Sequence, residues 1–263
     1  MKLTVLTAAL EQDTENLPER MHLACDAIIV NQCDKDGRAE WDYKGHKITV
    51  LNRAERGVGR SRNLALSEAY GDIVLFSDDD IIYDEGYVPK IIRAFRRRPK
   101  ADLLLFNVRV NEKRRTYWNS REKNVHSFNC GRYPTFCCAA RLDRLKEAGV
   151  EFSLLFGGGA PYANGEDSLF FMDCLRAGLK IRAVNVVIGY EKERTSTWFS
   201  GYDVKFFRDR GVLYAFLYRG WAELWAARFV LAKHKEMCKD IPPLDAFLLM
   251  HSGIKKGRQL CRG

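Results

Sequence analysis

Short apolar runs alternate with helical patterns along the first half of the chain. Five apolar runs are typical of buried strands: LTVLTAA, DAIIVNQ (26–32), KITVLN (47–52), DIVLFS and DLLLFNVRV. Two segments between them have the spacing of helices, RSRNLALSEAYG, which stops at Gly71, and YVPKIIRAFRRRPK, which stops at Pro99. Strands and helices in alternation predict an α/β fold with a mostly parallel sheet flanked by helices.

The second half of the chain is less regular. Residues 111–135 are polar, basic and aromatic, and we expect a hairpin or loop there. A short helix in RLDRLKEAGV precedes a glycine-rich loop, FGGGAPYANGED, which leads into a helix that Gly178 closes. KIRAVNVVIGY predicts a late strand, and the chain after about residue 202 is aromatic and helical.

Composition adds a basic excess to this picture. Among 263 residues, 43 Lys and Arg outnumber 34 Asp and Glu, and the net charge is +9. Such a charge suits a nucleic acid, an anionic membrane surface or a phosphorylated substrate, and does not choose among them. No stretch of about 18 residues is free of charge, so we expect no transmembrane helix.

The eight cysteines bear on the compartment. They contain no CxxC pair, and Cys137 and Cys138 are adjacent, so the spacing of a zinc site is absent. The first apolar run is too short for a signal peptide and is better explained as a strand. We therefore expect reduced, mostly structural thiols in a cytoplasmic protein.

Three consecutive carboxylates follow the fourth apolar run, in GDIVLFSDDD. Ligands of open α/β sheets bind at the carboxyl ends of the strands, which places these acids at the expected binding edge. In an extended segment Asp78 and Asp80 point the same way, because side chains alternate. Such a pair can hold Mg²⁺ or Mn²⁺, which in turn holds substrate phosphates. The alternative is a loop of solvated acids.

Two further motifs could carry chemistry. ERGVGRSRNLA puts arginines at the start of a helix, which suits an anionic ligand or else forms a flexible surface loop. NGEDSLFF puts Glu166 and Asp167 at the start of another helix. Acids there either complement the helix dipole or supply a general base in a cleft.

The three motifs occur in one order: GRSRNLALSEA, then GDIVLFSDDD, then GED about 87 residues later. In this order and spacing the chain resembles glycosyltransferase family 2, the inverting enzymes with the GT-A fold. ERTSTWFSGYDVKFFRDRG is similar to bacterial members that build surface polysaccharides. The resemblance implies a GT-A catalytic domain over residues 1–205, a Rossmann-like nucleotide-diphospho-sugar transferase sheet. A helical extension, 206–263, would pack on it or on the membrane.

The resemblance also implies roles for individual residues. The donor would be bound by Thr7, Ala8, Asp34, Arg62, Asp78 and Asp79. Asp80, together with Asp78, would hold Mn²⁺ or Mg²⁺ under the diphosphate. Asp167 would be the general base that deprotonates the acceptor hydroxyl, with Glu166 beside it. Apart from the resemblance, Gly158, Gly159 and Trp198 could supply acceptor contacts or a lid, and the alternative for Trp198 is a buried core residue.

The expected reaction is transfer of a sugar from a nucleotide-diphosphate donor, UDP-linked by our interpretation, to a hydroxyl of a glycan or lipid-linked glycan. A helix over residues 211–237 is rich in aromatic and basic residues, and could lie on the inner face of an anionic membrane or pack against the core. A nucleotidyltransferase of the same fold is one alternative, but LTAALEQDTENL lacks its glycine-rich loop. A basic nucleic-acid-binding module is the other. We expect no nucleic-acid partner, since the basic runs more simply solvate a helix face and a loop.

Overall fold

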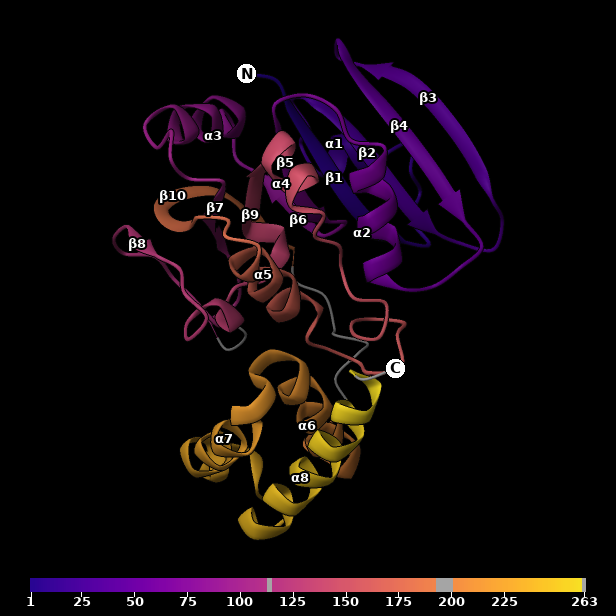
Figure 1. Ribbon diagram of the computed structural model, residues 1–263. Helices are drawn as coiled ribbons and strands as arrows, with labels where there is room; N and C mark the ends of the chain where they lie inside the picture. The colour runs from indigo at the N-terminus through magenta and orange to yellow at the C-terminus, as the bar shows by residue number, and fades with distance from the viewer. Residues whose placement is uncertain (113–114, 193–200, 262–263) are drawn as a thin grey trace. The chain divides into compact units, whose positions relative to one another are not determined.

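The computed structural model of the protein describes residues 1–112, 115–192 and 201–261 (Figure 1). The strands are β1 (Leu3–Leu10), β2 (Asp26–Gln32), β3 (Gly37–Tyr43), β4 (His46–Arg53), β5 (Ile73–Asp78), β6 (Ile81–Tyr83), β7 (Leu103–Arg109), β8 (Lys123–Asn124), β9 (Cys138–Arg141) and β10 (Ile181–Glu191). The α-helices are α1 (Leu17–Arg20), α2 (Val58–Ser67), α3 (Tyr87–Arg96), α4 (Leu142–Ala148), α5 (Glu166–Arg176), α6 (Val204–Tyr218), α7 (Ala222–Met237) and α8 (Pro243–Leu260). Short 3₁₀ turns cover Cys130–Arg132, Thr135–Cys137 and Arg219–Trp221.

One sheet contains all of these strands, in the order β3-β4-β2-β1-β5-β9-β7-β10-β6, with β8 paired to β10. The pairs β1–β2, β1–β5, β2–β4 and β7–β10 are parallel. Because β5 and β7 each pair antiparallel with β9, they also run in the same direction. Six strands therefore end at one edge of the sheet, and the predicted α/β class with mostly parallel strands is confirmed.

Four strands were absent from the prediction: the short β6 and β8, and also β3 and β9. β3 forms an antiparallel hairpin with β4 through Lys44 and Gly45, both with positive φ. Its residues are mostly exposed, so the segment has no apolar run to mark it. β9 is four residues long and fully enclosed between β5 and β7, where small side chains such as Ala139 and Ala140 are buried.

Two helices end earlier than predicted: α3 at Arg96, three residues before Pro99, and α2. α2 ends at Ser67, with Glu68 as its C-cap, and not at Gly71. Gly71 has φ +94° and belongs to the turn before β5, where an added Cβ would lie 3.1 Å from the Lys2 carbonyl oxygen. Gly71 thus allows the tight turn that leads into β5, and it does not end α2. The prediction for Gly178 is confirmed: its φ is +83° and its N–H bonds to the carbonyl of Leu175, past the end of α5.

Contacts divide the chain into two compact units. The first comprises Met1–Leu154 and Glu166–Arg194, and the second comprises Leu155–Gly165 and Thr195–Gly263. The first unit holds the sheet, with α2 packed on β1 and β2 and α3 packed on β10. The boundary expected from the resemblance, 205/206, stays a prediction.

Helices α6, α7 and α8 make up most of the second unit, and α6 and α8 approach each other very closely. A Cβ on Gly211 of α6 would lie 2.1 Å from the Met250 carbonyl oxygen. A Cβ on Gly253 of α8 would lie 2.0 Å from the carbonyl oxygen of Arg208. These glycines therefore let the two helix backbones touch.

The continuous helix predicted over residues 211–237 is interrupted. α6 ends at Tyr218, a 3₁₀ turn follows over Arg219–Trp221, and α7 begins at Ala222. Arg219 has φ +49°, outside the helical region, which breaks the hydrogen-bond ladder. No helix in the described residues is long and apolar enough to cross a membrane.

Candidate functional site

Thr7 and Ala8 lie where β1 meets β5, at the carboxyl edge of the sheet. Ala8 is the direct neighbour of Asp78 across this parallel pair, and Thr7 is that of Ser77. The Thr7 side chain is fully buried, and its hydroxyl makes no hydrogen bond within the described residues. The two predicted donor residues thus lie against the strand that carries the acids.

The three aspartates do not continue as an extended strand. β5 ends at Asp78, and Asp79 and Asp80 form a turn before β6. The prediction that Asp78 and Asp80 point the same way assumed an extended segment, and it is wrong because Asp80 lies in a turn. The carbonyl of Asp80 instead accepts the N–H of Lys192 at 2.8 Å, which ties the turn to the end of β10.

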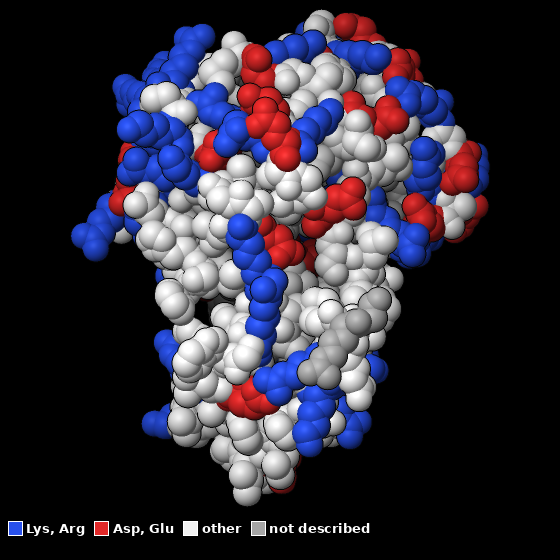
Figure 2. All heavy atoms as spheres, viewed as in Figure 1, with Lys and Arg blue, Asp and Glu red and all other residues white. Residues whose placement is uncertain are grey.

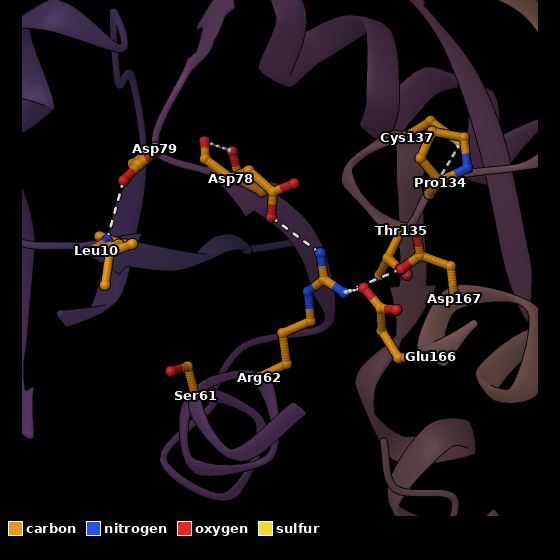
Figure 3. Close-up of polar contacts among 12 residues, drawn as sticks. Leu10, Ser61, Arg62, Asp78, Asp79, Pro134, Thr135, Cys137, Glu166 and Asp167 are labelled. Atoms are coloured by element: carbon orange, nitrogen blue, oxygen red, sulfur yellow. Dashed lines mark hydrogen bonds and ion pairs between the residues drawn. The ribbon is translucent and has the colours of Figure 1, made fainter. Parts of the chain in front are cut away.

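Asp79 is the buried member of the three, with 5% of its surface exposed. Its Oδ2 accepts the backbone N–H of Leu10 at 3.0 Å (Figure 3). The hydrogen bond links the turn after β5 to the last residue of β1. Asp79 thereby holds the edge of the sheet in place through Oδ2.

Arg62, from the motif ERGVGRSRNLA, contacts acids of the two other motifs, GDIVLFSDDD and NGEDSLFF. One terminal nitrogen donates to Asp78 Oδ1 at 2.9 Å, and the other to Asp167 Oδ1 at 2.9 Å (Figure 3). The latter nitrogen also lies 3.6 Å from Glu166 Oε1. Only 4% of the Arg62 side chain is exposed. We call Asp78, Glu166 and Asp167 around this guanidinium the carboxylate cluster.

Local packing fixes Arg62 at this place. Its guanidinium carbon lies 5.3 Å from the centre of the Phe152 ring, a cation–π distance. The Asn63 amide donates to the Phe152 carbonyl at 2.9 Å and accepts its N–H at 2.7 Å. A Cβ on Gly59 would lie 2.5 Å from the Ser153 carbonyl oxygen, so only glycine lets α2 come this close.

Glu166 and Asp167 open α5, as the sequence predicted. The Thr135 hydroxyl donates to the same oxygen of Asp167 that Arg62 contacts. Both donors are side chains from distant parts of the chain, so the Asp167 carboxylate does more than complement a helix dipole. Thr135, like Phe152, was missed by the sequence analysis.

The balance of charge in the carboxylate cluster is negative. Burial and then the neighbouring Asp167 raise the pKa of Glu166 to about 7. Burial also raises the pKa of Asp167, while Arg62 opposes that shift. Burial alone would lower the pKa of Arg62, but its carboxylate neighbours, Asp78 foremost, raise it above the ordinary value. A single buried cation thus partly neutralises three acids.

The remaining predicted residues are not gathered around Arg62. Asp34 is 95% exposed in the loop after β2 and pairs with Arg56 at 3.2 Å. Arg56 also pairs with Glu11 at 2.6 Å. Gly158 and Gly159 belong to the second unit, and Trp198 lies outside the described residues.

The side chains near the turn after β5 bear on the predicted cation site. In the described part of the chain, no group of three or more His, Cys, Asp or Glu side chains is placed to hold a metal ion. Mg²⁺ needs fewer, because it often uses one or two carboxylates together with substrate phosphates and water. Asp78 engages Arg62 through one oxygen only, Oδ1, and 28% of its side chain is exposed. The Asp78 carboxylate is therefore compatible with a bound cation whose other ligands come from a diphosphate and water.

The glycosyl transferase family 2 profile matches residues 3–147, which is more than half of the chain. The chain belongs to this family. The match includes α2 with Arg62 and β5 with the three aspartates. No curated protein matched in a sequence search.

Solved structures of a glycosyltransferase share the fold. S. aureus TarS, residues 1–349 with UDP-GlcNAc, is 15% identical with a TM-score of 0.63, over 91% of this chain and 74% of that one. The same TarS fragment with UDP is 16% identical with a TM-score of 0.60, over 92% and 74% of the two chains. A further structure of S. aureus TarS is 16% identical with a TM-score of 0.62, over 95% of this chain and 49% of that one. At such identities the likeness shows the fold, a GT-A sheet with C-terminal helices.

Proposed function

We propose that the protein is an inverting glycosyltransferase that moves a sugar from a nucleoside diphosphate donor to a hydroxyl of a glycan acceptor. Family membership supports the class of reaction. The observation that carries the proposal is Arg62, buried between Asp78 at a strand end and Asp167 at a helix start. Two of the TarS structures hold UDP-GlcNAc or UDP, and this supports a UDP-linked donor here. Bacterial polysaccharide biosynthesis is the pathway we propose.

Asp167 is the general base in this proposal. The acceptor oxygen attacks the anomeric carbon from the face opposite the leaving diphosphate, and its proton passes to the Asp167 carboxylate. A base must be ionised to accept that proton, and Arg62 and Thr135 favour the ionised form by donating to Oδ1. Neither of these hydrogen bonds goes to Oδ2, the oxygen that we assign to the acceptor.

Arg62 has a positioning role here. Its planar guanidinium holds Asp78 and Asp167 at fixed separation, because each terminal nitrogen bonds a different carboxylate. Asp78 faces the donor in this proposal and Asp167 faces the acceptor. Phe152, packed on the guanidinium, restricts its rotation. One buried side chain thus relates the two substrate subsites.

Asp78 and Asp80 are the residues that would hold Mn²⁺ or Mg²⁺. When bound, such a cation would neutralise charge on the leaving diphosphate. The protein's own residues then have separate tasks: Asp79 fixes the strand edge through Leu10, Arg62 orients the acids and Asp167 takes the proton.

The test of the reaction compares Asp167→Asn with Glu166→Gln. Asparagine keeps the size of the side chain but is no base, so we expect transfer to fall by about 10²-fold or more. Donor binding, measured by calorimetry over a panel of nucleotide sugars with and without Mn²⁺, should stay near wild type. Glu166→Gln should reduce transfer less. Asp143→Asn is a matched control, because Asp143 also lies in the first turn of a helix, α4.

Two results would count against the proposal. If no nucleotide sugar binds to the wild-type protein, the donor class is wrong. If Asp167→Asn transfers sugar at the wild-type rate while binding the donor, the helix start is only structural and another base must be sought.

We propose, in addition, a peripheral contact between the second unit and an anionic membrane. Leu224 and Leu231 of α7 are 61% and 74% exposed, and Trp221 just before it is 69% exposed. Arg228 and Lys235 share the helix face of the two leucines, at spacings of four residues from them. Exposed apolar side chains beside cations are typical of interfacial helices.

A further inference from the structure

A cavity of about 510 Å³ lies in the first unit, away from the carboxylate cluster. Its floor is apolar and includes Val125, Leu175, Leu179 and Ile181. It opens at the amino-terminal ends of β7 and β10, next to Ala101 and Ile181. Asp78 terminates β5, which runs in the same direction, so the cavity and the carboxylate cluster lie at opposite edges of the sheet. Its volume falls in the range of small-molecule sites, about 300–1,000 Å³.

Cations surround this apolar floor. Five of the lining residues are basic: Arg97, Arg98, Lys100, Lys180 and Arg182. A smaller cavity of about 150 Å³ shares two of them and adds Lys90 and Arg93. None of the described residues that line either cavity is acidic. In Figure 2, Lys and Arg side chains gather over the part of the surface where Figure 1 places α3, the helix that leads to Arg97.

The contacts of these cations indicate an anion. Glu122 contacts both Arg98 and Arg182, the latter at 3.8 Å, and so places one carboxylate between two guanidinium groups. Within the described part of the chain, Arg97, Lys100 and Lys180 have no ion pair, and Arg182 Nε is buried without a hydrogen-bond acceptor. Burial, Arg182 and Arg97 lower the pKa of Arg98, so these cations repel one another. An anion from outside would relieve that repulsion.

We propose that this cavity binds a small amphiphilic anion, a phosphate or carboxylate carried on an apolar body. The basic residues alone would suit any polyanion, but a polyanion without an apolar part would not bury the Leu and Ile side chains that line the cavity. A ligand with both parts uses the apolar floor and the cationic rim together, since apolar burial adds about 25 cal/mol per Å². The cavity lies at the C-terminal end of α5, whose first two residues are Glu166 and Asp167.

Decyl phosphate is a suitable probe, with inorganic phosphate and 1-decanol as controls for its two parts. We expect decyl phosphate, below its micellar concentration, to bind at least tenfold more tightly than either control in calorimetry. Methyl NMR should show the largest shifts at Val125, Leu175, Leu179 and Ile181. Arg97→Gln/Lys180→Gln should weaken binding by about tenfold, because it removes two charge-assisted contacts. Both side chains are exposed, so the fold should persist.

Arg208→Gln/Lys239→Gln is the matched control, which removes two exposed cations from the second unit. It should bind the probe as wild type does. Three outcomes would overturn the proposal. Equal binding of inorganic phosphate would mean that the apolar floor plays no part. Equal weakening by both double variants would mean that net charge alone acts. Shifts spread over exposed leucines such as Leu224 and Leu244 would mean adsorption without a site.

Discussion

Arg62 lies among three carboxylates in the first unit, whereas Gly211 and Gly253 bring two helix backbones together in the second. Both places are tightly packed, but for different physical reasons. Around Arg62 the arrangement depends on opposite charges in a poorly solvated place, and it changes with protonation. Between α6 and α8 it depends on the absence of side chains, and it is indifferent to pH. The first three predictions below test this contrast through the free energy of unfolding, and the fourth concerns the exposed surface of the second unit.

The largest effect is expected for Arg62→Met. Methionine fills similar space but leaves three partly buried acids without their cation, and losing one partner of a buried ion pair costs about 3–5 kcal/mol. Denaturant unfolding measures the loss. Arg60→Met, on the same helix, removes an arginine that is 50% exposed and pairs with Glu55, and should change stability by less than about 1 kcal/mol. Equal losses of stability in both variants would show that Arg62 stabilises the fold no more than an exposed arginine does.

Gly253→Ala should be next, at about 1–3 kcal/mol or more. Alanine usually stabilises a helix by about 0.5–1 kcal/mol relative to glycine, so destabilisation would reverse the ordinary sign. The reason is the Arg208 carbonyl oxygen, 2.0 Å from the added Cβ. Thermal unfolding followed by circular dichroism at several pH values checks both the size and the expected lack of pH dependence.

Gly220→Ala is the control for this substitution. Gly220 lies in the same unit, and an added Cβ there would meet no atom within 4 Å. If Gly253→Ala proves as harmless as Gly220→Ala, the helices are not in backbone contact and the comparison with Arg62 fails.

The third effect is a pH dependence at Glu166. Its pKa rises from an ordinary value of 4.5 to about 7 in the folded protein, chiefly because it is buried. The folded state thus binds this proton more tightly than the unfolded chain, so the contribution of Glu166 to stability falls as the pH rises through that window. Glu166→Gln stays neutral. Its stability relative to wild type should therefore increase by about 1–3 kcal/mol between pH 4.5 and pH 7.

Urea unfolding at a series of pH values measures this difference. Glu151→Gln, at an exposed glutamate, controls for the loss of one charge. A relative stability of Glu166→Gln that stays flat or falls with rising pH would show that the Glu166 carboxyl is not held in its neutral form.

The smallest effect on stability is expected for Trp221→Gln/Leu231→Gln. Both side chains are mostly exposed, so the unfolding free energy should change by about 0.5 kcal/mol or less. Flotation with anionic vesicles should nevertheless fall several-fold. Phe128→Gln/Leu154→Gln removes two exposed apolar side chains from the first unit and should float as wild type does. Equal flotation of both variants would contradict a membrane role for α7.

The sequence predicted most of the sheet because buried strands carry continuous apolar runs. β2 matches its predicted range, and β5 and β7 differ by a residue or two. It missed β6 and β8, which have three and two residues, β3, an edge strand that is mostly exposed, and β9, whose four residues form no recognisable period. Hydrophobic periodicity identifies a strand only where enough of its residues alternate between buried and exposed or form a long apolar run. The sequences of β3 and β9 have neither pattern.

The site was predicted in part. The resemblance placed Asp78, Arg62 and Asp167 in one site, and the structure brings their side chains together. Their supports, Thr135 and Phe152, lie 32 residues before and 15 residues before Asp167 in ordinary-looking segments. Only the folded chain reveals them, because a single hydroxyl or ring leaves no spacing signal. The geometry of Asp80 was wrong, since a turn replaced the expected extension.

The central position of β9 has a consequence for synthesis of the protein. β5 and β7 both pair with β9, which leaves the ribosome after them. Arg141, at the end of β9, follows Arg109, at the end of β7, by 32 residues, which take about 2–6 s to translate at roughly 5–20 residues per second. During that interval β5 presents an open edge next to apolar residues, a surface that can pair with other chains. The nascent chain is therefore most prone to misassembly after β7 has been synthesised and before β9 has been. A chaperone would have its greatest effect during that interval.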